Sequence, residues 1–204
     1  MSNDPDIETA VQRELLQVAL RNSARSVGLL MAAVLFIAWL GWEHRQPAAT
    51  LATLLLGSAV AGWRWLMQRR QRHIEALDSA QIRRVVTELE ANAVLVGGMW
   101  IVATLAIYPA LNGVTATVYV VMVCGSVATA AFFLSVAGRS FLWLTTLQLG
   151  SLIVVSLLDD SARSVPLAVL AAIFGVTMVR SAHEFRDTTR RALHHGLQAD
   201  AANA

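Results

Sequence analysis

Six blocks of apolar residues dominate this chain, and their lengths compare with the about 20 helical residues that cross a hydrocarbon core. They cover residues 24–42, 48–67, 91–108, 114–137, 141–158 and 165–179. Because lipid offers the backbone no hydrogen-bond partners, such blocks cross it as helices. Of the 204 residues, 56% are hydrophobic and 15% charged, against about 45–50% and about 25% in soluble domains. The sequence therefore predicts an all-α polytopic membrane protein with six transmembrane helices.

Arginine is concentrated in the segment 64–84, between the second and third apolar blocks. All 16 basic residues of the chain are arginine. Short loops rich in arginine stay on the cytoplasmic side of a membrane. With both termini inside, only Arg45 and Arg163 lie outside, whereas the reverse orientation would place most arginines outside. We therefore predict that both termini are cytoplasmic.

The two ends of the chain have helical patterns outside the apolar blocks. Residues 1–23 carry apolar residues at helical spacing and predict a cytoplasmic amphipathic helix. It could lie on the inner leaflet, pair with a second copy, or lead into the first span. Residues 180–204 predict a cytoplasmic stalk that extends the last span and ends in a frayed tail beyond Gly196. Met178, Phe185 and Ala192 form a weak heptad seam, which fits a dimeric stalk and an ordinary half-buried helix equally well.

The second apolar block contains two features that bear on packing. Gly57 and Ala61 stand four residues apart, a spacing that permits close contact between helices. Arg64 lies between Trp63 and Trp65, and we expect its guanidinium to reach the lipid headgroups between the two indoles.

The chain contains no motif of a known catalytic or phosphate-binding type. None of its acidic residues lies in a predicted span, and all five histidines lie in loops or tails. Pumps and ion-coupled transporters generally need ionisable groups within the membrane. We therefore expect no catalytic residues, no metal site and no cofactor. The small basic excess, a formal net charge of +2, is explained by inward-facing arginines and does not indicate nucleic-acid binding.

Two groups of polar residues are candidate sites. Any internal ligand pocket is expected to be lined by four side chains from the fourth and fifth spans: Gln148, Tyr119, Ser126 and Thr129. Packing alone also explains these side chains, because polar groups in lipid hydrogen-bond to neighbouring helices. A charged cluster at the outer ends of the spans could sense protons or cations, and includes Glu43, His44, Asp159 and Asp160.

The layout resembles the N-terminal membrane sensor regions of bacterial hybrid histidine kinases and diguanylate cyclases. The features shared are an amphipathic N-terminus, six spans with short outer loops, an arginine-rich loop after the second span, the sequence Gly97-Gly98-Met99-Trp100 in the third, and a charged stalk starting at Arg180. The resemblance covers nearly the whole chain and rests on layout, without a diagnostic motif.

The resemblance implies a homodimeric input module in the bacterial inner membrane, with no enzymatic activity of its own residues. It would pass a membrane signal, or an apolar ligand in the bundle, to a cytoplasmic signalling domain. The output helix would carry Arg180, Phe185 and Arg191. Two rivals are a small transporter or channel, which would need a continuous polar path, and a structural membrane anchor, which would need no pocket.

Overall fold

The computed structural model describes residues 5–70, 79–136, 138–158 and 164–203, and all regular structure in these ranges is helical. The elements are α1 (Pro5–Glu43), α2 (Pro47–Arg70), α3 (Ser79–Ala106), the short 3-10 helix η2 (Tyr108–Ala110), α4 (Gly113–Leu134), α5 (Ser140–Leu158) and α6 (Ser164–Asn203). The prediction of an all-α protein is confirmed.

Five of the helices contain stretches long and apolar enough to cross a membrane. These stretches are Ser26–Glu43, Ala80–Ala110, Gly113–Leu134, Ser140–Leu158 and Ser164–Gly196. The second predicted span, in α2, is not among them. Several apolar helices therefore fit a multi-pass membrane protein, while the count of six spans and their orientation stay predictions.

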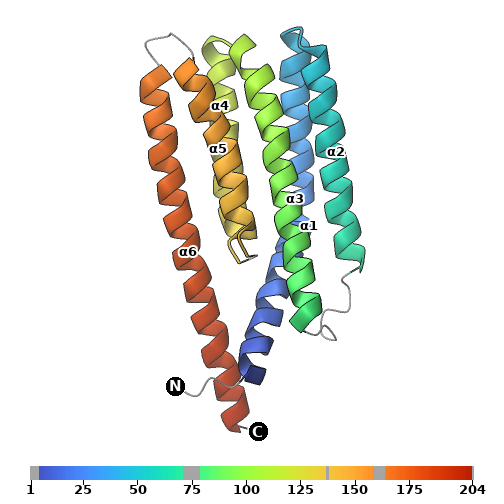
Figure 1. The fold of residues 1–204 in the computed structure, drawn as a ribbon, viewed down its shortest axis with the longest axis vertical. Coiled ribbons are helices and arrows are strands. Elements are labelled where there is room, and N and C mark those ends of the chain that lie inside the picture. The colour runs from blue at the N-terminus through green and yellow to red at the C-terminus, as the bar shows by residue number, and fades with distance from the viewer. Residues whose placement is uncertain (1–4, 71–78, 137, 159–163, 204) are drawn as a thin grey trace.

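The helices stand side by side along one axis and form a bundle, in which the start of α1 and the end of α6 lie at the same end (Figure 1). Helix α3 packs against both α2 and α5, α1 packs against α2, and α6 packs against α5. The core between them is apolar and includes the fully buried side chains of Trp100, Met99, Ile37 and Leu152.

Helix α1 is continuous from Pro5 to Glu43, so the N-terminal segment leads into the first apolar stretch without a break. Its first half forms a second apolar cluster, in which Val11, Leu16 and Ala19 pack with Ile82 and Val85 of α3. The sequence left three arrangements open for this segment: on the inner leaflet, paired with a second copy, or leading into the first span. In the structure it leads into the first apolar stretch, and its apolar side chains are buried against other helices of the same chain.

Helix α6 also runs further than expected. It continues through Gly196 to Asn203, whereas the sequence predicted that the regular helix ends near Gly196. Gly196 has no positive φ angle, and the residues after it include several alanines, the strongest helix former. The tail therefore extends the helix instead of ending it.

Small residues allow close contacts between neighbouring helices, of which Gly57 and Gly97 are examples. A side chain at Gly57 of α2 would collide with Val34 of α1, and a Cβ at Gly97 of α3 would come within 2.6 Å of Leu147 Cδ1 in α5. The close contact predicted from Gly57 and Ala61 is therefore confirmed at Gly57. In contrast, a Cβ at Gly62 would meet no atom within 4 Å.

Replacing Gly57 by valine should lower the free energy of unfolding in detergent by about 1–3 kcal/mol, because the added methyl groups overlap Val34. Gly62→Val, in the same helix but in open space, is the matched control and should change it little. Thermal unfolding followed by circular dichroism measures both. Equal losses for the two variants would show that α1 and α2 do not pack closely at Gly57.

Candidate functional site

Arg64 is buried inside the bundle, where its side chain is only 5% exposed. Its Nε and Nη2 donate to Asn92 Oδ1 at 3.0 and 2.8 Å, and its Nη1 donates to Ser26 Oγ at 2.8 Å. The expectation that Arg64 reaches the headgroups is therefore wrong. The two hydrogen-bond partners, one on α1 and one on α3, hold the guanidinium between the helices and supply the acceptors that it needs away from water.

The buried face of α2 explains why the arginine points inward. Its buried residues include Gly57, Val60, Ala61, Arg64 and Met67, which recur every three or four positions and so lie on one side of the helix. Asn92 also ties α3 to this face, since its Nδ2 donates to the Val60 carbonyl at 3.2 Å. The same packing that brings Gly57 against α1 therefore places Arg64 beside Ser26 and Asn92.

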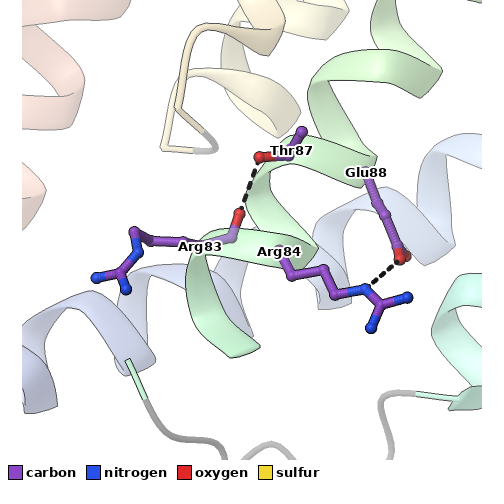
Figure 2. Close-up of polar contacts among 4 residues, drawn as sticks. All are labelled: Arg83, Arg84, Thr87 and Glu88. Atoms are coloured by element: carbon purple, nitrogen blue, oxygen red, sulfur yellow. Dashed lines mark hydrogen bonds and ion pairs between the residues drawn. The ribbon is translucent and has the colours of Figure 1, made fainter. Parts of the chain in front are cut away.

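Among the side chains that the structure describes, the charge of Arg64 has no carboxylate partner. An exposed ion pair of α3 offers a comparison: Arg84 Nε lies 3.7 Å from Glu88 Oε1 one turn along the helix (Figure 2). Such a surface pair contributes about 0.3–0.5 kcal/mol, because water and salt screen it. Arg64 thus differs from Arg84 both in being buried and in facing neutral oxygens only.

Arg64 and Ser26 also line a cavity of about 300 Å³. Its walls come mainly from α1 and α4, with single residues of α2, α3 and α5. Apart from Arg64 and three hydroxyl groups, the lining side chains are apolar, among them Leu30, Ala33, Met122, Phe133 and Leu144. The cavity therefore combines one buried positive charge with mainly apolar walls.

The structure separates the four residues predicted to share a pocket. Ser126 and Thr129 line the cavity beside Arg64. Gln148 and Tyr119 are fully buried but do not line it. Gln148 Nε2 donates to the Val123 carbonyl at 3.3 Å, and the Tyr119 hydroxyl lies 2.9 Å from Thr104 Oγ1. Gln148 therefore links α5 to α4, and Tyr119 links α4 to α3.

The predicted outer cluster is described only in part, because Asp159 and Asp160 lie outside the described residues. Glu43 is exposed, and His44 Nδ1 lies 2.9 Å from the Leu40 carbonyl, to which it donates. The histidine thus caps the end of α1. No group of three or more possible metal ligands occurs among the residues whose placement is described.

The predicted output residues lie along the exposed part of α6. Arg180 is exposed, and Arg191 Nε donates to the Asp187 carbonyl in its own helix at 3.3 Å. The Phe185 ring meets Phe132 of α4 edge-on, with ring centroids 6.4 Å apart. Among the three predicted output residues, Phe185 therefore makes an aromatic contact with another helix.

A further link joins α6 to the turn between α4 and α5. Arg186 Nη1 donates to the Gly138 carbonyl at 3.3 Å, while the backbone N–H of Arg139 donates to Glu90 Oε1 of α3 at 2.6 Å. Gly138 has a φ angle of +56°, which a residue with a Cβ adopts only at a cost. The turn is thus held between α3 and α6.

No family model, no curated protein and no solved structure matches this chain.

Sequence reasoning missed the roles of Arg64, Asn92 and Ser26, although one signal was present. Arg64 continues the spacing of Gly57 and Ala61, so it belongs to the face of α2 that packs against other helices. Asn92 opens the third predicted span and is 1% exposed, which makes it a second buried amide beside Gln148.

Replacing Asn92 by leucine should destabilise the protein by about 1–3 kcal/mol, because it leaves buried donors of Arg64 without an acceptor. The double variant Asn92→Leu with Arg64→Met should recover part of this loss, since neither polar partner then remains. Asn112→Leu, at an exposed position, is the control. Thermal unfolding of Asn92→Leu, Arg64→Met, the double variant, the control and the parent gives the coupling energy, and strictly additive losses would contradict a direct interaction.

Proposed function

We propose that this protein is the sensory input module of a bacterial signal-transduction system, of the histidine kinase or cyclic-di-GMP type. It would cross the cytoplasmic membrane six times with both termini inside and would act on a cytoplasmic output domain through α6. The observation that carries this proposal is the continuity of α6, which runs without a break from Ser164 in the apolar bundle to Asn203 in the charged stalk.

A continuous helix behaves as a stiff rod, so a rotation or tilt within the bundle moves its far end. Arg186 of α6 donates to the Gly138 carbonyl in the α4–α5 turn, and the backbone N–H of Arg139 in the same turn donates to Glu90 of α3. A rearrangement of α4 against α1 would therefore reach the stalk through hydrogen bonds already in place. Signalling requires two such arrangements that the signal populates differently.

The position of Arg64 supports α2 as a transmembrane span in addition to the five helices that are long and apolar enough. Arg64 faces protein oxygens inside the bundle, so the outer surface of α2 can lie against lipid without exposing the guanidinium to hydrocarbon. The orientation is supported by the arginine distribution.

A homodimer is part of the proposal, and the stalk beyond Phe185 is the surface that supports it. Met178, which begins the heptad seam, and Ala182, one turn further along α6, pack against the core of their own chain. From Phe185 to Gly196 α6 is largely exposed, so this part of the helix remains available to a second copy.

Insertion of one to four alanines after His195 tests the proposal in a fusion of the full chain to a diguanylate cyclase catalytic domain. Each residue added rotates the following helix by about 100°, so cyclic-di-GMP output in cells should rise and fall with insert length. The same insertions in a flexible linker after Ala204 should have no such pattern. Output that ignores the helical insertions would favour a passive membrane anchor, and ion or solute flux in liposomes would favour a transporter.

Removing the link between the turn and the stalk should alter the basal output of the same fusion. Arg186→Gln withdraws the charged donor from the Gly138 carbonyl and should shift the output equilibrium by about 0.5–2 kcal/mol. Glu184→Gln removes an exposed charge from the same helix and should leave the output near that of the parent. If both variants behave alike, the turn does not couple to α6.

A further inference from the structure

The guanidinium of Arg64 has hydrogen-bonding capacity that the chain leaves unused. An arginine side chain carries five N–H groups, and three of them donate to Asn92 and Ser26. Among the side chains that the structure describes, one N–H on each of Nη1 and Nη2 has no acceptor and no carboxylate balances the charge. A buried cation of this kind attracts an anion, and carboxylates and phosphates fit the planar arginine side chain best.

The cavity next to this charge has the shape of a site for an apolar chain. Ser26 marks the start of the apolar stretch of α1, and Ala33 lies two turns further along the same wall. At 1.5 Å per residue, the lining thus extends about 10 Å from the level of Arg64 into the apolar part of the bundle. A volume of about 300 Å³ is at the lower end for ligand pockets, about 300–1,000 Å³, and suits a single chain.

The position of the cavity also gives a ligand a route from lipid. Leu29 of α1 and Gly125 of α4 both line it and are both exposed, Leu29 to 55%. The cavity is therefore open on the outer surface of the bundle between α1 and α4. An amphiphile in the surrounding leaflet can enter sideways, with its head group remaining at the polar end.

From these observations we infer that the cavity binds an amphiphilic anion, whose carboxylate or phosphate head group pairs with Arg64 and whose single apolar chain lies between α1 and α4. The inference names the ligand class of the proposed input module and in that sense rests on the proposed function. The binding itself involves neither α6 nor an output domain, so it can be tested separately.

Native mass spectrometry of the full chain in a neutral detergent tests the inference with four probes. Oleate represents a free fatty acid and monoacyl phosphatidic acid a phospholipid-derived anion, while oleyl alcohol lacks the charge and inorganic phosphate lacks the chain. We expect saturable binding of one or both acyl anions. The anion that binds more tightly shows whether the ligand class is a free fatty acid or a phospholipid-derived anion. Equal binding of oleyl alcohol, binding of phosphate alone, or no binding of either acyl anion would overturn the inference.

Two variants locate the site. Arg64→Met should weaken binding of the acyl anion at least about tenfold by removing the charge. Gly125→Leu keeps the Arg64 hydrogen bonds and fills the cavity, since a Cβ at Gly125 meets no atom within 4 Å, and should weaken binding to a similar extent. The controls Arg69→Met and Gly62→Leu change an exposed arginine and an open glycine of α2 and should retain it. Unchanged binding to Gly125→Leu would place the ligand elsewhere, even if Arg64→Met fails to fold.

Discussion

The hydrogen bonds of Arg64 are the interaction on which the arrangement of this bundle depends. A guanidinium taken out of water is tolerated only when polar groups replace the water, and here Asn92 and Ser26 do so from two other helices. Hydrogen bonds to a charged group contribute about 1.5–3 kcal/mol each, and losing an acceptor costs a comparable amount. One side chain thus fixes the relative positions of α1, α2 and α3.

The same arrangement leaves α1 and α4 apart near Arg64, and this separation forms the cavity. Helix α4 therefore has packed neighbours on one side and a fillable space on the other. At its end the α4–α5 turn is bonded to Glu90 of α3 and to Arg186 of α6. A ligand that changes the distance between α1 and α4 would act on this turn, and the continuous helix α6 would carry the change out of the bundle. In the proposed function, ligand binding in the cavity would thereby be coupled to α6.

The positions of the helices could be predicted from the sequence because the length and spacing of apolar blocks depend on local composition alone. The partners of Arg64 could not, since they lie 28 and 38 residues away and meet it only once three helices have packed. The flanking tryptophans suggested an interfacial side chain, but the face shared with Gly57 and Ala61 decided its direction. Likewise Ser126 and Thr129 reach the cavity, whereas Gln148 finds a backbone carbonyl at Val123.

The most direct test of this account is a solid-state NMR measurement of the contact between Arg64 and Asn92 in lipid bilayers. Protein labelled with ¹⁵N in the arginine guanidinium groups and ¹³C in the asparagine side-chain carbonyl should show strong dipolar dephasing, because Nε and Nη2 lie 3.0 and 2.8 Å from Asn92 Oδ1. The signal should disappear in Asn92→Leu. Absence of dephasing in the parent protein, with Arg64 accessible to water at the membrane surface, would contradict a buried guanidinium and the cavity site built on it.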